Sequence, residues 1–556
     1  MARAATMAPT RERDLRIMRM TGPLWTGIAA AVLAWCLYVF GPPGGDAATH
    51  LYQEHLIRQN GLQFWDNLWY SGRYSLVNYT LLYYPLAIAV TPAITVAAAV
   101  GGAVAAFTRL VRTAWGRIAT PAIVAATLVI PLQVVAGVYP FILGLAFGLG
   151  ILVALQSGRV WVASVLAVAT LLSHVMAFGF VVMVLVAWVA ADRSLLEQRR
   201  VRIFAAVLAA CIIVQLLSIR AFSLPGGRYM FDPKDLAAVL VFSAAGAALC
   251  YGLPAMRGLM IFFGLYGLAA IVDFAIPNAV GGNIVRLMAT AALPLILLPV
   301  AARRFRPGWI ATLAIAGIAL WQGISPVTEW TASAAAPGQN AAYWTPVLSF
   351  LGRNAGPDYR VEVVQSKRYW EAYYVAGRGY ALARGWYRQD DYPGNAILYN
   401  APSPVTYRAW LRSAGVRYVI LSDATLDPSS AAEASLLRGG NSGLVVVERT
   451  GPWTIYALPD PTPIVTPAGA AAVTSITPTT LTLRVRRAVR LTVRVHDTPY
   501  WTADGTGAGC VATGTGATTT VVPARPGTLV MRFAVRPASV VRALLGTATS
   551  CGAPGS

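Results

Sequence analysis

Long stretches of apolar residues, nearly free of charge, fill the chain between residues 24 and 325. A helix needs about 20 apolar residues, with a minimum near 17, to cross the hydrocarbon core of a bilayer. The pattern therefore predicts a polytopic membrane protein with about eleven transmembrane helices, in a domain over residues 1–330. The predicted spans are 24–40, 83–107, 119–135, 139–155, 160–173, 176–191, 203–222, 236–252, 258–275, 287–302 and 308–325.

Two of these segments, 160–173 and 176–191, are short and are separated only by a hinge at Ser173-His174. They form either two spans or one kinked segment. The choice decides on which side of the membrane every later loop and domain lies. Counted as two, they place the arginine-rich loops in the cytoplasm, as the positive-inside rule requires. These loops contain Arg109, Arg112, Arg117, Arg159, Arg193, Arg199, Arg200, Arg202, Arg257, Arg303, Arg304 and Arg306.

The count of eleven also fixes the two ends of the chain. The basic segment 11–19 lies in the cytoplasm, and the first span is retained because Gly41-Pro42-Pro43-Gly44 is a poor signal-peptide cleavage site. Residues after 323 fall outside the cytoplasm. We expect a multi-pass protein of the plasma or inner membrane.

The pattern changes after residue 330. Residues 331–458 predict an extracytoplasmic α/β domain, which a proline-rich linker at 459–467 ends. A helix over 407–413 is stopped by Gly415, because glycine readily ends a helix. The strands expected in this domain are 361–364, 416–421, 444–448 and 453–458.

Residues 468–556 alternate apolar and polar positions with period two, which predicts an extracytoplasmic β-sandwich-like domain. Cys510 and Cys551 belong to it, so an oxidising compartment makes them a candidate disulfide, with two unpaired thiols as the alternative. The strands expected here are 481–486, 491–495, 518–522 and 529–535, and the other cysteines, which lie in apolar spans, are Cys36, Cys211 and Cys250.

Composition agrees with a membrane protein: 56% of the residues are hydrophobic, 12% are charged, and the net charge is +21. A positive charge of this size can indicate nucleic-acid binding, but the arginines lie between apolar segments and are not interleaved with aromatic residues. We therefore expect no nucleic-acid partner. The sequence also contains no phosphate-binding loop, nicotinamide fingerprint, zinc-ligand spacing or nucleophile elbow.

The loop after the first span carries the clearest candidate chemistry. If residues 47–56 are helical, Asp46, His50 and Glu54 share one helix face. A carboxylate beside an imidazole can bind a cation or take a proton from a hydroxyl group. Trp69 and Tyr84 fit either an interfacial aromatic belt or a floor for binding a sugar.

Three further polar positions lie in or beside apolar spans. Arg286 follows Gly281-Gly282-Asn283 at a predicted helix start, so it is either a phosphate clamp, together with the backbone N–H groups, or a snorkelling arginine. Asp273 is expected to pair with Arg286 or to act as a second acid. His174 is expected either to face a cavity or to be a structurally satisfied histidine.

The first loop resembles the C-type (GT-C) membrane glycosyltransferases, which carry an acidic residue directly after the first helix. Within that superfamily it looks most like the membrane proteins named after 6-pyruvoyl-tetrahydropterin synthase. The residues that carry this resemblance are Asp46, His50, Gly61, Trp65, Trp69, Gly72 and Tyr84-Pro85-Leu86. Looser similarities to bacterial, in particular actinobacterial, relatives are carried by 360–363, 369–371, 382–389, Tyr500-Trp501 and 525–528.

The resemblance implies transfer of a sugar from a polyprenyl-phosphate donor to an envelope glycan or lipid acceptor outside the cytoplasm. Asp46 would be the general base or would orient the acceptor hydroxyl, with Glu54 as the next acid. Many relatives carry two adjacent acids at this point, whereas alanines follow Asp46 here. No metal site is therefore expected, and a divalent cation is possible but not required.

Two other functions fit a membrane protein of this kind. A transporter or flippase of a lipid-linked substrate usually shows paired halves and charges at the midplane, whereas the charges here gather at loop edges. A non-catalytic envelope assembly protein would bind a glycan or partner through its outer domains. The glycosyltransferase remains the leading interpretation.

Overall fold

The computed structural model describes residues 21–224, 226–303, 308–516, 518–547 and 549–551. Its internal contacts divide the chain into two units. The helical unit comprises Met1–Asp46, Asn78–Gln215 and Tyr229–Ala334, and the mixed unit comprises Ala47–Val77, Leu216–Arg228 and Ala335–Ser556. The basic segment 11–19, Arg304 and Arg306, which support the predicted orientation, lie outside the described residues.

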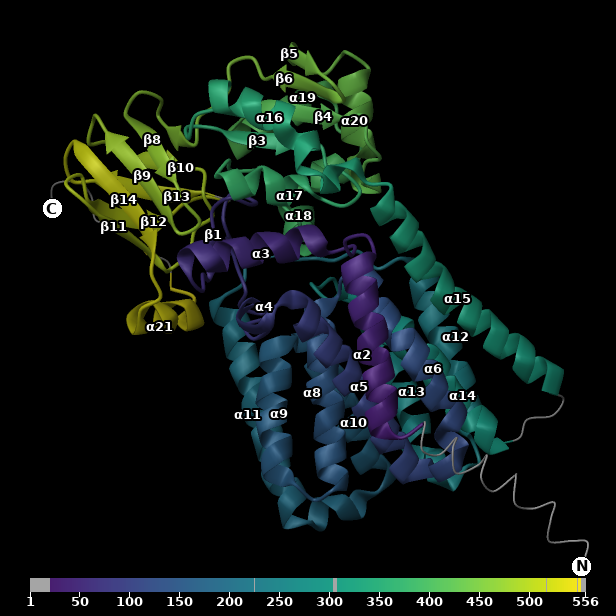
Figure 1. Ribbon diagram of the computed structural model, residues 1–556. Helices are drawn as coiled ribbons and strands as arrows, with labels where there is room; N and C mark the ends of the chain where they lie inside the picture. Colours follow the sequence, from purple (N-terminus) through teal and green to yellow (C-terminus); the bar gives the residue numbers. More distant parts are fainter. Residues whose placement is uncertain (1–20, 225, 304–307, 517, 548, 552–556) are drawn as a thin grey trace, which may run out of the picture. The chain divides into compact units, whose positions relative to one another are not determined.

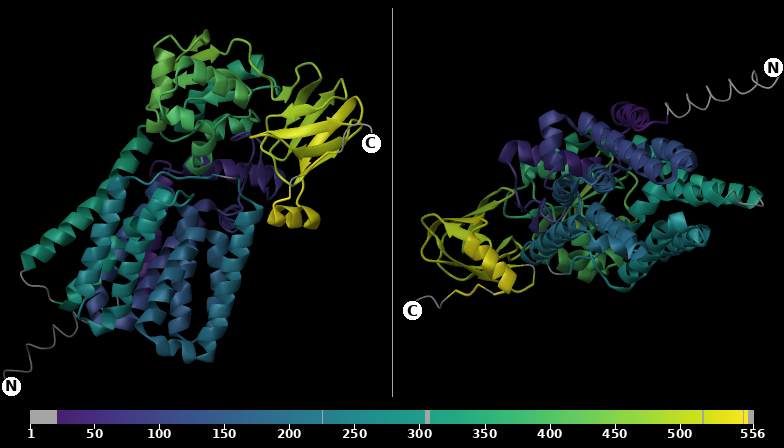
Figure 2. Two further views of the ribbon diagram at one scale, coloured as in Figure 1. Left: turned by 180° about the vertical axis from the view of Figure 1, so that it is seen from behind. Right: turned by 90° about the horizontal axis from the view of Figure 1, so that it is seen from below.

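The helical unit consists of apolar helices that run side by side (Figures 1 and 2). Its helices are α2 (Pro23–Phe40), α4 (Tyr83–Val90), α5 (Pro92–Trp115), α6 (Thr120–Val129), α7 (Gln133–Ala136), α8 (Tyr139–Gln156), α9 (Val160–Ser173), α10 (Val175–Ala191), α11 (Arg199–Ala221), α12 (Pro233–Cys250), α13 (Arg257–Ala275), α14 (Arg286–Arg303) and α15 (Gly308–Ala334). The last residues of α11 belong to the mixed unit.

Small residues let α2 and α5 approach closely. A Cβ atom added to Gly27 would lie 2.9 Å from the Cβ atom of Ala105, and one added to Gly101 would lie 2.8 Å from the Gly27 carbonyl oxygen. Between apolar helices, such small-residue contacts replace the hydrophobic driving force that water provides in soluble proteins. The first predicted span, α2, is therefore packed closely against α5.

The predicted span 83–107 is divided in two, because α4 ends at Val90 and α5 begins at Pro92. Proline has no N–H to continue a helix, and it disfavours the helical conformation of the residue before it. Thr91 adopts φ 140° and caps α5, accepting a hydrogen bond from the Ile94 N–H at 3.4 Å. The sequence pattern missed this break because both sides of it are apolar.

Seven helices among the described residues are long and apolar enough to cross a membrane. One of them, Pro92–Ala136, is interrupted at Gly116, which adopts φ +57°. The shorter apolar helices α9 and α10 are separated by His174 in an extended conformation, and both contact α8. The chain is thus a multi-helix membrane protein, and the count of eleven spans stays a prediction.

In the mixed unit, one four-stranded sheet has the order β3-β4-β6-β5, with β3 parallel to β4 and the other neighbours antiparallel. The strands and helix predicted here are confirmed within one or two residues at most ends. The strands are β3 (Arg360–Val363), β4 (Val416–Ser422), β5 (Val445–Thr450) and β6 (Trp453–Ala457), and the helices are α16 (Ala341–Asn354), α17 (Glu371–Tyr374), α18 (Arg388–Asn395), α19 (Pro404–Ala414) and α20 (Ala431–Arg438).

The helix α19 shows why the prediction succeeded. Ser403 caps its start by accepting a hydrogen bond from the Thr406 N–H at 3.2 Å, and Gly415 ends it with φ +72°. Tyr407 and Leu411 are fully buried, one turn apart, and join the core of the sheet. Capping residues and an apolar stripe are both local signals, so the sequence alone reveals them.

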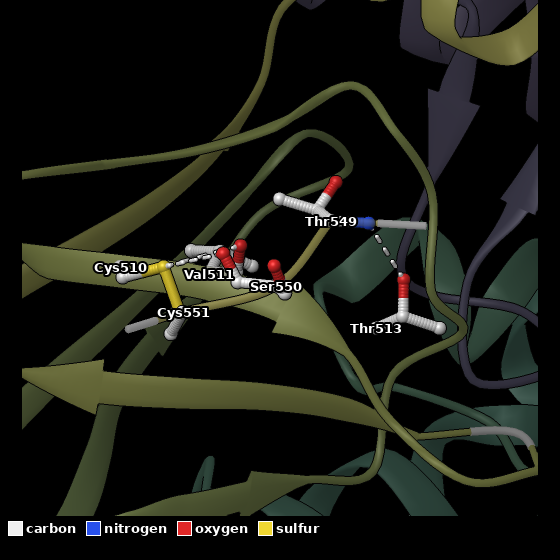
Figure 3. Close-up of a disulfide and its surroundings, with 6 residues drawn as sticks. All are labelled: Cys510, Val511, Thr513, Thr549, Ser550 and Cys551. Atoms are coloured by element: carbon white, nitrogen blue, oxygen red, sulfur yellow. Dashed lines mark hydrogen bonds between the residues drawn. A yellow bond between two sulfur atoms is a disulfide. The ribbon is translucent and has the colours of Figure 1, made fainter. Parts of the chain in front are cut away.

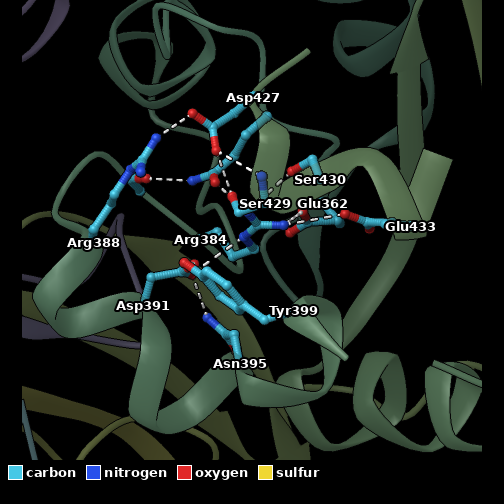
Figure 4. A network of polar contacts seen from close by, with 12 residues as sticks. Glu362, Arg384, Arg388, Asp391, Asn395, Tyr399, Asp427, Ser429, Ser430 and Glu433 are labelled. Carbon is cyan, nitrogen blue, oxygen red and sulfur yellow. Dashed lines mark hydrogen bonds and ion pairs between the residues drawn. The ribbon is translucent and has the colours of Figure 1, made fainter. Parts of the chain in front are cut away.

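A buried cluster of charges lies beside this sheet (Figure 4). The guanidinium of Arg384 forms ion pairs with Glu433 at 3.1 Å, Asp391 at 3.2 Å and Glu362 at 3.6 Å, and all four side chains are at most 2% exposed. Burial, then the neighbouring charge of Glu433, raises the pKa of Glu362. One cation beside three buried acids thus favours a protonated Glu362, which lowers the cost of burying the cluster.

The C-terminal strands form two four-stranded sheets around one core, which confirms the predicted sandwich. The sheet orders are β12-β13-β10-β7 and β11-β14-β9-β8. Residues 465 and 466 of the predicted linker already form a strand. The strands are β7 (Val465–Thr466), β8 (Ala471–Ile476), β9 (Thr480–Val485), β10 (Leu491–Val493), β11 (Trp501–Asp504), β12 (Gly509–Thr513), β13 (Thr519–Pro523) and β14 (Gly527–Phe533), followed by the helix α21 (Pro537–Leu545).

The predicted disulfide between Cys510 and Cys551 is present, with the two Cα atoms 5.7 Å apart (Figure 3). Cys510 belongs to β12, and Cys551 follows α21 near the chain end. Backbone contacts support the same attachment, because the Thr513 N–H donates to the Thr549 carbonyl oxygen at 3.0 Å. The bridge therefore fastens the segment after α21 to the edge of a sheet.

Residues Ala47–Val77 pack with the C-terminal part of the chain, whereas the sequence assigned them to a membrane domain over 1–330. They form the helix α3 (Ala47–Asn60) and the short strands β1 (Trp65–Asp66) and β2 (Arg73–Tyr74). The Leu382 N–H donates to the Leu68 carbonyl oxygen at 2.8 Å, and Arg73 pairs with Asp390 at 2.6 Å. Contacts between residues more than 300 positions apart leave no local signal in the sequence.

Candidate functional site

The turn between α7 and α8 organises one end of the helical unit. Asp46 and the residue before it are held there by their backbone: the Asp46 N–H donates to Ala136 at 3.2 Å and the Gly45 N–H to Val135 at 3.1 Å. Gly137 adopts φ +80°, and a Cβ atom on it would lie 2.7 Å from the Asp46 nitrogen. Glycine is therefore required at this turn, and it lets the half-buried Asp46 sit directly on the helix connection.

Tyrosine rings surround the same turn. Tyr139, the first residue of α8, packs against Tyr38 of α2 with ring centroids 5.5 Å apart and against Tyr83 of α4 at 6.2 Å. Tyr84 packs edge-to-face on Tyr83 at 5.2 Å and is fully buried. Tyr84 therefore packs within the fold, and its role in binding a sugar stays a prediction.

His174, which separates α9 from α10, is the second predicted residue at this turn. Its ring lies between those of Phe141 on α8 and Tyr79, with centroid distances of 5.5 and 5.7 Å. The side chain is 6% exposed, and the charge of Arg286 acts on it electrostatically. His174 and Arg286 are thus brought together, although they are 112 positions apart in the sequence numbering.

Arg286 begins α14, and two neutral amides fasten the first turn of that helix. Gln133 of α7 donates to the Ala289 carbonyl oxygen at 3.2 Å, and Gln322 of α15 donates to the same oxygen at 2.8 Å. Both glutamines are at most 8% exposed. The sequence analysis missed them, although a glutamine within an apolar span is a signal of a buried polar contact.

The backbone before Arg286 is not arranged as the sequence suggested. The predicted clamp used free N–H groups of the glycines, but the Gly281 N–H donates to the Asn278 side chain at 3.2 Å and the Gly282 N–H to Met230 at 3.2 Å. The Asn283 N–H donates to Val280 at 3.0 Å. These donors are already used within the fold, so only the guanidinium of Arg286 is left to act on a phosphate.

Close packing against the backbone explains why position 281 is a glycine. It adopts φ +45°, and a Cβ atom on it would lie 2.1 Å from the carbonyl oxygen of Tyr229. The neighbouring Asp273 accepts a hydrogen bond from Asn278 through Oδ1 at 2.7 Å, instead of pairing with Arg286 as one prediction had it. Asn283 is half-buried in the short 3₁₀ turn between them.

The other predicted residues, His50, Glu54 and Trp69, belong to the mixed unit. The predicted helix is confirmed as α3, so His50 and Glu54 lie one turn apart, and both are buried. Burial raises the pKa of Glu54 to about 7, and the nearby charge of Arg58 partly opposes this. Glu54 is therefore able to hold a proton near neutral pH.

Trp69 is fully buried, and its role in binding a sugar stays a prediction. Its ring stacks on Tyr52 with centroids 4.2 Å apart, and its Nε1 donates to the Ala372 carbonyl oxygen at 3.2 Å. Tyr52 in turn donates to Asp66 at 3.0 Å, and burial raises the pKa of Asp66 to about 6. These contacts make Trp69 a structural link within the mixed unit.

Among the described residues, no group of three or more histidine, cysteine, aspartate or glutamate side chains is placed to hold a metal ion. Asp46 belongs to the helical unit and Glu54 to the mixed unit.

No family model matches the sequence. No curated protein matches it either. Two solved structures have a similar fold: the arabinofuranosyltransferase AftD from Mycobacteria, with a TM-score of 0.46, and the archaeal oligosaccharyltransferase AglB from Archaeoglobus fulgidus, with a TM-score of 0.37. Each is 14% identical to this chain.

The AftD match covers 92% of this chain but only 57% of AftD, so the chain spans little more than half the length of that protein. The AglB match covers 72% of this chain and 69% of AglB, which was solved in complex with an inhibitory peptide and a dolichol-phosphate. Both similar structures are glycosyltransferases by name.

Proposed function

We propose that this protein is a membrane glycosyltransferase of the C type, which moves a sugar from a polyprenyl-phosphate donor to an envelope glycan or lipid acceptor. The observation that supports this most directly is the turn between α7 and α8. The backbone of Asp46 is bonded beside this turn, Phe141 in the first turn of α8 contacts the ring of His174, and Gln133 at the start of α7 donates to the first turn of α14. The acid Asp46 and the helix that begins with the cation Arg286 therefore both contact the region where α7 joins α8.

The proposed chemistry needs these two charges. Asp46 takes the proton of the acceptor hydroxyl, whose oxygen attacks the anomeric carbon of the donor sugar. The bond between that carbon and the phosphate oxygen breaks, and polyprenyl phosphate leaves with the electron pair. Arg286 stabilises the charge that develops on the phosphate, because the planar N–H groups of a guanidinium match the geometry of phosphate oxygens. His174 packs between aromatic rings and positions the neighbouring groups.

The proposal includes a direction across the membrane. We place the N-terminus in the cytoplasm and residues 331–556 outside it, since the arginine-rich loops then lie on the cytoplasmic side. The disulfide between Cys510 and Cys551 supports an oxidising compartment for the sandwich. Reporter fusions after Ala335 and Pro467 that are active only in the cytoplasm would overturn this orientation.

The decisive experiment is sugar transfer by the purified full-length protein in proteoliposomes. A panel of radiolabelled polyprenyl-phosphate monosaccharides is offered together with envelope glycans and lipids as acceptors. We expect label to move from one donor to an acceptor, and to do so in the presence of EDTA. Donor movement between leaflets without transfer would instead favour a flippase, and glycan binding without either would favour an assembly protein.

A further inference from the structure

The short helix α21, which follows the last strand of the sandwich, is apolar on two sides. Its inner side packs into the sandwich core through Ala543, with Val540 and Leu544 against the same core. Its outer side carries Val541 and Leu545, which are 54% and 70% exposed. The inner residues hold the helix against the sandwich. The outer residues make no contribution to that packing, so their apolar character needs another explanation.

The same core also contains the end of a membrane helix. Ala221, the last residue of α11, is one of the buried residues of the sandwich core, as is Ala543 of α21. Tyr500 of the sandwich donates to the Ala221 carbonyl oxygen at 3.1 Å and stacks on Phe222 with ring centroids 5.0 Å apart. The sandwich is thus fixed directly to the point where α11 ends.

The length of α11 indicates how deep in the membrane its last residue lies. α11 has 23 residues, so it is about 35 Å long, slightly more than the roughly 30 Å of a hydrocarbon core. Leu216 and Leu217 near its end are 61% and 48% exposed, as expected for side chains in lipid. The residues that follow, Arg220 to Phe222, therefore belong at the boundary between lipid tails and headgroups.

Arginines complete the pattern around α21. The guanidinium of Arg220 lies against Gly546, the residue directly after Leu545, and Arg536 and Arg542 are exposed on α21 or directly before it. Exposed apolar residues beside arginines are characteristic of helices that lie in a membrane interface, where the arginines reach the lipid phosphates.

We infer that α21 is an interfacial anchor, which inserts Val541 and Leu545 into the lipid surface beside the end of α11. The sandwich is then attached to the membrane at two adjacent points, the end of α11 and α21. Two attachments restrict the tilt of the sandwich relative to the bilayer, whereas one helix end alone leaves it free to rotate. This inference does not depend on the proposed transferase activity.

The test measures which solvent surrounds the outer face of α21. In full-length protein with Cys36, Cys211 and Cys250 replaced by alanine, Val541→Cys and Leu545→Cys each receive a nitroxide label, and the native disulfide is left intact. The protein is placed in nanodiscs of equal parts phosphatidylethanolamine and phosphatidylglycerol. Collisions of the label with oxygen, which concentrates in lipid, are compared with collisions with a water-soluble nickel chelate.

The matched control is Val489→Cys, because Val489 is also an exposed valine of the sandwich, at 38%. We expect the labels at 541 and 545 to favour oxygen over nickel several-fold more than the label at 489. Nickel accessibility equal to that at 489 would place the face in water and overturn the inference. Low accessibility to both reagents would overturn it too, since it would mean that protein covers the face.

Discussion

The side-chain amide of Gln322 on α15 takes over a backbone hydrogen bond of α14 at Ala289. It donates to the Ala289 carbonyl oxygen at 2.8 Å and accepts the Leu293 N–H at 3.0 Å. In an uninterrupted helix these two backbone groups would bond to each other. A side chain inserted into that ladder is a recognised cause of helix bending, and here it lies one turn after Arg286.

Replacing Gln322 by leucine is expected to destabilise the protein by about 1–3 kcal/mol, because the buried Leu293 N–H loses its acceptor and the Ala289 carbonyl oxygen keeps only the hydrogen bond from Gln133. Thermal unfolding in nanodiscs measures the change. Thr328→Ala is the matched control on the same helix, since it removes only an exposed hydrogen bond to Ser325. Equal effects of the two variants would show that the inserted amide has no special role.

Asp46→Asn tests the proposed general base. The variant keeps the shape and the backbone contacts with Ala136 but cannot take a proton, so we expect transfer to fall by about 10²–10⁴-fold. Initial rates at saturating donor give the comparison, and Asp504→Asn on the sandwich surface is the control with full activity expected. If Asp46→Asn transfers sugar at the parental rate, another group is the base.

Glu54→Gln tests the second predicted acid in the same transfer assay. Burial raises the pKa of Glu54 to about 7, a value that also suits a general base near neutral pH, so this variant tests the alternative to Asp46. We expect its loss to reduce transfer less than the loss of Asp46. Equal losses would point to two acids that act together.

Arg286 is expected to bind the donor phosphate through its guanidinium alone, because the neighbouring backbone N–H groups are used within the fold. Arg286→Ala should therefore lose binding of polyprenyl phosphate, and Arg286→Lys should keep part of it through its charge. Binding is measured with purified variants in nanodiscs. Arg257→Ala, at the start of α13, is the control, and unchanged binding by Arg286→Ala would make Arg286 a snorkelling residue.

Local signals account for what the sequence predicted correctly. The alternating residues of β9 and the capped helix α19 depend on neighbours in the chain, and the apolar helices follow from composition. The break at Pro92 was missed because length and hydropathy dominated the interpretation. Proline after Thr91 was the signal that would have found it.

The candidate site was less predictable, because its contacts join distant parts of the chain. Asp46, His174 and Arg286 were each singled out as polar residues in unusual places, but only the fold shows that Asp46, His174 and the first turn of α14 all contact α7, α8 or the turn between them. The contact of Trp69 could not be predicted for the same reason, because its partner Ala372 lies 303 positions away.

The disulfide is expected to stabilise the sandwich against unfolding. Closing a loop with a sequence separation of 41 residues removes unfolded-state entropy worth up to ~4 kcal/mol. Cys510→Ala combined with Cys551→Ala should lower the thermal midpoint and expose the chain end to proteolysis. Cys36→Ala, which removes a free thiol of the helical unit, is the control, and identical midpoints for the paired variant and the parent would contradict the stabilising role.

Stability is expected to depend on pH through Glu371, which is 3% exposed in the mixed unit. Its carboxylate accepts hydrogen bonds from the Ser366 N–H and hydroxyl at 3.1 and 2.7 Å, but burial dominates and raises its pKa from 4.5 to about 7. The nearby cation Arg384 only partly opposes this. The folded state thus holds the proton more tightly than the unfolded chain does.

This difference in proton affinity determines whether the stability rises or falls with pH. Below pH 4.5 both states are protonated and Glu371 costs nothing, whereas above about pH 7 both are ionised and the buried charge costs ~3 kcal/mol. Glu371→Gln keeps an accepting oxygen for Ser366 but cannot ionise. Its stability relative to the parent should therefore rise between pH 5 and about 8, as measured by thermal unfolding. Glu448→Gln, at a partly exposed ion pair with Arg353, is the control, and a constant difference between Glu371→Gln and the parent across this range would exclude Glu371 as the titrating group.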